Sequence, residues 1–422
     1  MTALDTRAPL DAALAPGALR TLLQPVVRLD DEQVVGWEAL TRGPAGGPLE
    51  RPDLLFAAAR AAGRTAELDL RALATAVDSA LAAGVGGDGA LLLNAEPEGL
   101  AALRPGDLAA ERRRLEAAGV RVVLEVTERA LTTRPAELLR AVRLVRTWGW
   151  SLALDDVGAD RASLALLPLL APDVVKLDLR LVQERSSVET AAIVNAVRAH
   201  AERTGALLLA EGIETAEHAE LARALGADYG QGWRFGRPGA GPVGRAHPLP
   251  LPSCSPPPVH HTPWQALAPH ALVRASAKPL LLAMSTTLER QALVGGESVV
   301  VVGTFQQARF FTPRTARRYA GLAREAALVA ALAVDLPEVP ADGVRGTALA
   351  PGDPLVQEWD LAVVGPHFAA ALVAHDDGDT GPEAERRFRY VLTYDRDTAL
   401  SVAASLLARV RPDAPVLPRQ GR

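Results

Sequence analysis

Before residue 240, short apolar segments alternate with longer segments that are rich in Ala, Leu and Arg and have helical period. This alternation is typical of repeated βα units, because strands buried in a parallel sheet are apolar throughout, whereas the covering helices are apolar every three or four residues. It predicts a barrel or a doubly wound sheet, and about eight strands are what a (β/α)₈ barrel needs. The expected strands are residues 22–29, 34–39, 90–94, 121–127, 151–155, 173–178, 206–211 and 226–230.

The first two of these strands are joined by only a few polar residues, 30–32. A parallel crossover needs a dozen residues or more, so the two strands should form an antiparallel hairpin, an irregularity in the barrel. The expected helices are residues 51–62, 68–83, 135–147, 188–204 and 216–225.

A stretch crowded with Pro and Gly, residues 241–263, has no periodic apolar pattern and is typical of a linker. It separates a first domain, residues 20–240, from a smaller α/β domain, residues 264–412. In the second domain we expect an initial helical stretch, a strand over 298–305 and an amphipathic helix over 313–331. Further strands are expected at 360–364, 369–374 and 387–394, before a final helix that ends near residue 410.

Composition excludes several classes of protein. The formal charge is −5, so no broad basic field exists for binding a nucleic acid duplex. The single cysteine, Cys254, cannot form an internal disulfide, and the early acidic N-terminus lacks a secretory signal, so a cytoplasmic location is expected. No apolar run approaches the ~20 residues that cross a bilayer, which predicts no membrane span.

Acidic residues and one amide stand at the carboxyl ends of six expected strands. These ends converge on one mouth of a (β/α)₈ barrel, where the carboxylates would repel one another unless cations neutralise them. Mg²⁺ or Mn²⁺ would suit such oxygen ligands, and two ions ~3.5–4 Å apart would suit in-line attack on a phosphodiester. Any one of these residues alone would be interpreted as a helix N-cap. The set is Glu38, Asn94, Glu125, Asp155 with Asp156, Asp178 and Glu211.

Lys176 lies two residues before Asp178 and is one of only two lysines among 45 basic residues. Burial could lower its pKa or let it hold a water, a role that the fork of Arg would not serve. The alternative is an ion pair that stabilises the carboxylates.

Eight strings resemble the EAL domain in order and spacing: QPVV (24–27), EALTR (38–42), LLLN (91–94), EVTE (125–128), DDVG (155–158), VKLD (175–178), AEGIET (210–215) and GQGWRFGRP (230–238). The resemblance implies a modified TIM (β/α)₈ barrel that hydrolyses cyclic di-GMP to linear pGpG with two Mg²⁺ or Mn²⁺ ions. It also implies a homodimer formed through the barrel.

Carried over residue by residue, the resemblance implies that Glu38, Asn94, Glu125 and Asp155 hold one metal ion. Asp155 would bridge to a second ion, held also by Asp156 and Glu211. Lys176 would orient or deprotonate the attacking water, so that Lys176, Glu211 and Glu38 form the catalytic set. Substrate contacts would come from Arg42 and Gln231, and support from Glu214 and Glu128.

One segment departs from the family, which usually reads close to DDFGTGYSSL where this chain reads DDVGADRASL. The replaced positions are Val157, Ala159, Asp160, Arg161 and Ala162. In the family this loop couples dimerisation to metal and substrate binding, and Asp160 removes the backbone freedom of a glycine. The departure favours low activity, or the alternative of a cyclic di-GMP receptor that does not turn the nucleotide over.

Residues 264–412 resemble the DICT domain, through stretches at 277–293, 317–333, 354–376 and 386–397. The resemblance implies sensing of an unidentified ligand or partner. Trp359, Phe368 and Phe388 could line a ligand pocket, but aromatics amid apolar runs are more often core.

Overall fold

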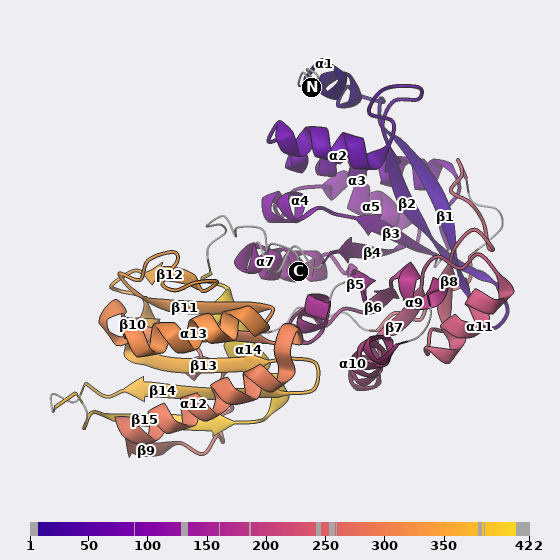
Figure 1. Cartoon of the computed structure of the whole chain (residues 1–422). Coiled ribbons are helices and arrows are strands. Elements are labelled where there is room, and N and C mark those ends of the chain that lie inside the picture. Colours follow the sequence, from indigo (N-terminus) through magenta and orange to yellow (C-terminus); the bar gives the residue numbers. More distant parts are fainter. Residues whose placement is uncertain are drawn as a thin grey trace, which may run out of the picture. The chain divides into compact units, whose positions relative to one another are not determined.

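The computed structural model describes residues 7–87, 89–127, 134–159, 161–184, 187–241, 246–252, 258, 260–378, 382–383 and 385–410. The chain divides into two compact units. The first comprises residues 1–130, 141–159 and 172–256, and the second comprises residues 131–140, 160–171 and 257–422. The first unit contains a closed eight-stranded barrel and the second a seven-stranded sheet (Figure 1).

The barrel strands follow one another in chain order around the closed sheet. Strand β1 pairs antiparallel with β2 and with β8, whereas β2 to β8 are successively parallel, which confirms the expected hairpin. The strands are β1 (Arg20–Arg28), β2 (Val34–Arg42), β3 (Ala90–Asn94), β4 (Arg121–Val126), β5 (Ser151–Val157), β6 (Val174–Leu177), β7 (Leu207–Ala210) and β8 (Tyr229–Gln231).

Helix α1 (Arg7–Ala13) precedes β1. The other helices lie in the connections between the strands: α2 (Pro52–Ala61), α3 (Thr65–Ala82), α4 (Pro97–Ala102), α5 (Ala109–Ala117), α7 (Pro135–Thr147), α8 (Leu166–Leu170), α9 (Leu179–Gln183), α10 (Val188–Thr204) and α11 (Ala216–Ala224). Local sequence sets both ends of α10. Ser187 and Thr190 form a capping box at its start, and Gly205 ends it in the left-handed region with φ +74°.

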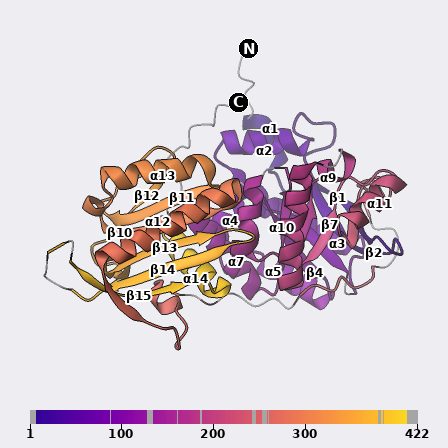
Figure 2. The same cartoon turned by 60° about the horizontal axis from the view of Figure 1, so that its bottom comes forward.

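The second sheet has the strand order β12-β11-β10-β13-β14-β15-β9, in which only β10, β11 and β12 pair parallel. Helices α12 (Lys278–Gly295) and α13 (Pro313–Glu325) cover one face, and α14 (Arg396–Leu407) lies against the other (Figure 2). The strands are β9 (Arg274–Ala277), β10 (Val300–Gln307), β11 (Leu328–Val334), β12 (Arg345–Leu349), β13 (Glu358–Val364), β14 (Ala369–Asp376) and β15 (Arg387–Thr393). No helix among the described residues is long and apolar enough to span a membrane.

The helix expected over residues 313–331 is wrong only in its last part, residues 326–331. Helix α13 ends at Glu325, and residues 328–334 form β11, which is buried between β10 and β12. A short apolar run that is buried on both faces has no period of its own, so periodicity could not separate the strand from the end of the helix. The helical stretch expected at the start of the domain is α12, which begins only at Lys278, after a short 3₁₀ turn (Trp264–Ala266) and β9.

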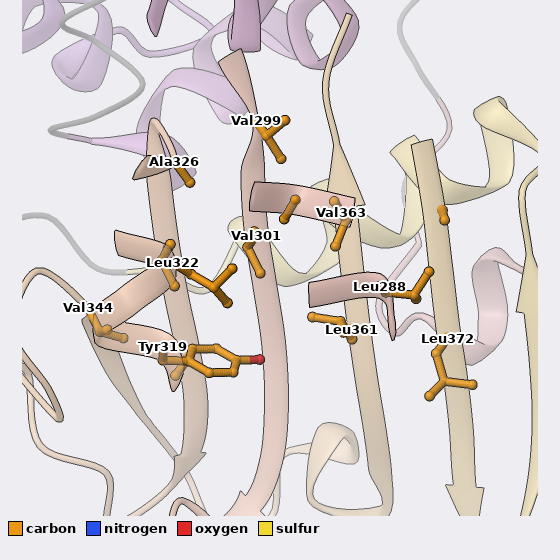
Figure 3. Close-up of a cluster of buried hydrophobic side chains, with 14 of the residues drawn as sticks. Leu288, Val299, Val301, Tyr319, Leu322, Ala326, Val344, Leu361, Val363 and Leu372 are labelled. Carbon is orange, nitrogen blue, oxygen red and sulfur yellow. The ribbon is translucent and has the colours of Figure 1, made fainter. Parts of the chain in front are cut away.

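A single apolar layer joins α12 and α13 to the sheet beneath them (Figure 3). Leu288 comes from α12, Tyr319 and Leu322 from α13, and Val301 and Leu361 from the strands. The Tyr319 ring extends toward β10, where a Cβ added to Gly303 would lie only 3.0 Å from its hydroxyl oxygen. Glycine at position 303 therefore makes room for the buried tyrosine.

Candidate functional site

Two layers of side chains fill the barrel toward the carboxyl ends of its parallel strands. Leu92, Val123, Ala153, Val174 and Leu209 form part of a buried apolar cluster. Two residues further along each strand, and so on the same face of the sheet, the polar residues Asn94, Glu125, Asp155, Lys176 and Glu211 follow. Asn94 pairs directly with Glu125, whereas Asp155 and Glu211 lie two residues beyond the register partners of Glu125 and Lys176. All five residues nevertheless stand at the carboxyl ends of their strands, where they form a polar layer.

The ammonium group of Lys176 lies at the centre of this polar layer. Its Nζ is 2.8 Å from Glu211 Oε1, 3.0 Å from Glu125 Oε2, 3.0 Å from Asp155 Oδ1 and 3.6 Å from Glu38 Oε1. The Lys176 side chain is only 1% exposed. The structure thus brings four of the predicted site carboxylates around the one predicted lysine.

Glu38 on β2 is held by two amides. Asn94 Nδ2 donates to Glu38 Oε1 at 2.9 Å, and Gln231 Nε2 donates to Glu38 Oε2 at 2.5 Å. Gln231 also donates to Gln24 Oε1 at 3.2 Å, and Gln24 in turn donates to the carbonyl of Gly236. These contacts fix the orientation of the Glu38 carboxylate.

Sequence reasoning assigned no role to Gln24, although it opens the QPVV string. The antiparallel register places Gln24 directly opposite Glu38, so the predicted hairpin contained the information needed to find it. Gln231, interpreted from sequence as a substrate contact, is buried and bonded to Glu38 in the structure.

The four carboxylates outnumber the single ammonium of Lys176, and burial acts on the pKa values of Glu125, Glu211 and Glu38. Burial raises the pKa of Glu125 well above its usual value, and burial raises the pKa of Glu211 to about 8. For Glu38, burial opposes ionisation, but Lys176 and the two amides outweigh it and lower the pKa. Burial therefore opposes full ionisation of the cluster, and a divalent cation could offset this cost.

Burial alone would lower the pKa of Lys176, but the surrounding carboxylates Asp155, Glu125, Glu211 and Glu38 raise it well above its usual value. Of the two interpretations made from sequence, the geometry supports the ion pair over a neutral amine.

A compact group of oxygen donors lies beside this lysine cluster. Carboxylate oxygens of Asp155, Asp156 and Glu211 all lie within 4.8 Å of one another. Asp156 adopts a left-handed backbone with φ +55°, which is costly for a residue other than glycine and turns consecutive aspartates toward one site. Burial, followed by repulsion from Asp155, raises the pKa of Asp156.

Two buried oxygens of the cluster, Glu125 Oε1 and Asp155 Oδ1, have no hydrogen-bond partner in the part of the chain that the structure describes, although Asp155 Oδ1 is in ion-pair range of Lys176. Such oxygens are costly to bury without a ligand. The donor set therefore fits a hard divalent cation.

Other predicted residues lie elsewhere. Asp178 is the N-cap of α9, since its Oδ1 accepts from the Arg180 backbone N–H at 2.9 Å, which is the local role that applies to a single strand-end acid. Arg42 ends β2 on the Glu38 side and donates to its neighbour's carbonyl. Glu214 is exposed in the loop after β7, and Glu128 lies outside the described residues.

Comparison with known proteins identifies two family models. The model of the EAL domain matches residues 7–238. The model of the DICT domain, described as a sensory domain in diguanylate cyclases and two-component system, matches residues 264–377.

Relatives of the first region include two proteins from Pseudomonas aeruginosa. The cyclic di-GMP phosphodiesterase RocR is 35% identical over 118 residues, which are 28% of this chain and 30% of RocR. The cyclic di-GMP phosphodiesterase NbdA is 30% identical over 241 residues, which are 56% of this chain and 31% of NbdA. This chain thus spans about a third or less of the length of these relatives.

Among solved structures, a manganese/cy-diGMP complex of BlrP1 from Klebsiella pneumoniae is 32% identical to this chain. The match covers 54% of this chain and 57% of that one, with a TM-score of 0.47.

Proposed function

The chain belongs to the EAL domain family, and on this premise we propose that its barrel hydrolyses one phosphodiester bond of cyclic di-GMP to give linear pGpG. The observation that carries the proposal is the convergence of Glu38, Glu125, Asp155 and Glu211 on Lys176 at the carboxyl end of the barrel. A purely structural barrel would fill this layer with apolar side chains, because buried ion clusters stabilise a fold less well than packed hydrocarbon does.

In this proposal Glu38, Asn94, Glu125 and Asp155 hold one divalent cation, Mg²⁺ or Mn²⁺, and Asp155, Asp156 and Glu211 hold the other. When bound there, the ions would supply an activated water and charge stabilisation for the phosphate. The compact grouping of Asp155, Asp156 and Glu211 supports the second set.

The chain's own residues position these ligands. Gln231 and Gln24 hold the Glu38 carboxylate in place, and Asn94 shares its amide nitrogen with Glu38 while its carbonyl oxygen remains available. Lys176, which stays charged, neutralises the carboxylates and donates hydrogen bonds to the attacking water, so we assign it as a water anchor. Arg42 would contact a substrate phosphate through its guanidinium fork.

The alternative is a receptor that binds cyclic di-GMP without hydrolysing it. It is favoured by the altered segment at residues 157–162, in which Asp160 lies outside the described residues.

We further propose that the chain works in the cytoplasm as a homodimer that forms through the barrel. Its domains would be residues 20–240 and 264–412, joined by a linker at 241–263, and the DICT domain would regulate the barrel.

The test incubates the purified chain with cyclic di-GMP and Mg²⁺ or Mn²⁺ and follows pGpG by chromatography. Glu38→Ala is the inactive control, and Asp342→Asn, an exposed acid of the second domain, is the matched active control. Product that disappears only in Glu38→Ala supports the phosphodiesterase. Tight binding of cyclic di-GMP without product in any metal would identify the receptor instead.

A further inference from the structure

The second domain contains a cavity of about 600 Å³ on the face of the sheet that α12 and α13 cover. This volume is within the usual range for small-molecule sites. Tyr319 and Leu361 line it, and in Figure 3 they lie at the opposite end of the apolar layer from Val299 and Ala326. The cavity is thus continuous with the domain core at one end.

Polar residues interrupt the buried stripe of α12 where this helix lines the cavity. The buried positions of the stripe are Leu281, Ser285, Leu288, Glu289 and Ala292. Glu289 is neutralised by Arg318 of α13, whose Nε and Nη2 donate to its two carboxylate oxygens at 2.6 and 3.2 Å. Arg318 is not available to neutralise a second anion in this arrangement.

Ser285 differs from the two hydroxyl residues that follow it. Thr286 and Thr287 donate to the helix carbonyls of Leu282 and Ala283 at 2.8 and 2.9 Å. The Ser285 hydroxyl, on a residue only 5% exposed, has no hydrogen-bond partner among the residues that the structure describes. A buried hydroxyl without a partner costs free energy, so its position on the cavity wall indicates a ligand.

The cavity walls are aromatic. Phe305 meets Tyr319 edge to face at a centroid distance of 5.3 Å, and Trp359 meets Phe388 in the same way at 5.6 Å. These pairs offer ring faces and edges to a planar molecule. Gln306, also on the wall, has a left-handed backbone with φ +58°, a strain that is typical of binding sites.

The charged residues at the rim indicate which charge the ligand carries. Lys278 pairs with Glu383. Arg290 and Arg314 also line the cavity and are exposed, and within the described ranges neither forms an ion pair. Two arginines therefore remain available for an anion.

From these observations we propose that the cavity binds a planar aromatic molecule that carries one anionic group. Its rings lie between Trp359 and Phe305, its polar edge bonds to Ser285, and its anionic group meets Arg290 and Arg314. This site is separate from the proposed phosphodiesterase site, so that either proposal can fail without the other.

The test is calorimetric titration of the full chain with two matched probe pairs. Indole-3-acetate is compared with tryptamine, and flavin mononucleotide with riboflavin. We expect at least one anionic probe to bind with a dissociation constant below about 1 mM and about 10-fold more tightly than its partner. Failure of both anionic probes to bind, or equal binding within both pairs, would overturn the proposal.

Substitutions in the cavity lining test whether the probe binds in this cavity. Arg290→Gln combined with Arg314→Gln should weaken binding of the anionic probe about 10-fold and leave binding of its uncharged or cationic partner unchanged. The control is Arg324→Gln, which alters an exposed arginine of α13 outside the cavity lining and should change neither affinity. Ser285→Ala should weaken binding about 5-fold. Unaltered affinity in both the arginine pair and Ser285→Ala would place the probe elsewhere and reject the site.

Discussion

At the barrel mouth, charged side chains arrive from the ends of successive strands, whereas in the second domain the polar groups of the cavity come mainly from the two helices α12 and α13. The barrel cluster has an excess of buried carboxylates around one ammonium. The cavity lining contains two buried acids, Glu289, which Arg318 neutralises, and Asp360, which accepts from Thr304, together with Ser285, whose hydroxyl has no partner among the described residues, and two available arginines. The first arrangement suits metal ions, and the second suits an organic anion.

The second domain also contains a buried acid that differs from those of the barrel. Asp360 on β13 is 1% exposed and accepts a hydrogen bond from Thr304 Oγ1 at 3.2 Å. Burial, followed by repulsion from Glu358, raises its pKa well above the usual value. In the barrel a lysine compensates such acids, whereas Asp360 is best accommodated by keeping its proton. A buried carboxyl is therefore evidence of a metal site only where several converge.

The largest effect is expected from removing the central cation of the barrel. Lys176→Met leaves four carboxylates uncompensated, which should destabilise the barrel by about 3–5 kcal/mol and lower kcat by a factor on the order of 10³. Lys176→Arg, which keeps a charge but cannot act as a base near neutral pH, should retain measurably more activity than Lys176→Met. Equal loss of kcat in the two variants would contradict the water-anchor role. Thermal unfolding and pGpG formation provide the measurements.

Divalent cations should stabilise the barrel more than the second domain. Mn²⁺ at about 100 times its dissociation constant should add about 2.7 kcal/mol, a rise in Tm of a few degrees. Asp156→Asn should reduce this rise, because Asp156 belongs to the compact oxygen group, and Asp342→Asn should not. The measurement is a thermal scan with and without chelator. A rise that persists in full in Asp156→Asn would exclude that residue as a ligand.

Asp360 should make the stability of the second domain pH-dependent. Because its pKa is raised on folding, the folded state retains a proton that the unfolded state releases. The stabilisation is thus complete below the ordinary pKa of Asp and is lost as pH rises through the raised pKa. Asp360→Asn should remove this pH dependence. The difference in free energy of unfolding between variant and wild type should therefore shift in favour of the variant by about 1–3 kcal/mol between pH 4.5 and pH 8.5. Parallel Tm profiles of variant and wild type between these pH values would refute the assignment.

The smallest effect is expected from Ser285→Ala on the buried stripe of α12, with Leu288→Ala as the contrasting variant. Leu288→Ala should lower the free energy of unfolding by about 2–5 kcal/mol, since it opens a hole in the apolar layer. Ser285→Ala should leave it unchanged or raise it by up to about 1 kcal/mol, because a hydroxyl without a partner is removed. Urea titrations measure both. A loss of more than about 1 kcal/mol in Ser285→Ala would mean that the hydroxyl has a structural partner.

Sequence reasoning reached most of the barrel because its signals are local. The expected strand over 90–94 and the expected helices over 135–147 and 188–204 coincide with β3, α7 and α10. Lys176 and its carboxylates were identified because each follows an apolar strand, and Asp178 was included among them for the same reason. In the structure Asp178 instead caps α9 and pairs with the Arg180 guanidinium.

The second domain was harder to predict. Strand β11 was merged with the preceding helix, and β9 and β12 were not expected. Trp359 and Phe388 were named from sequence as possible pocket residues, with core as the more common role, and in the structure both line the cavity and pack in or against the core. The sequence could not reveal the cavity, because the space between α12 and the sheet depends on how the two helices pack.

The amino-acid sequence by itself determined the βα rhythm of the barrel, the antiparallel first pair and the family to which the chain belongs. These follow from the periods of 2 and 3.6 residues and from motif spacing, which are properties of the chain. Only the tertiary structure decided that Lys176 is an ion-paired cation, that Gln24 supports Glu38 and that Ser285 faces a cavity. Charge, orientation and empty volume depend on side chains brought together from distant parts of the chain, and no local period encodes them.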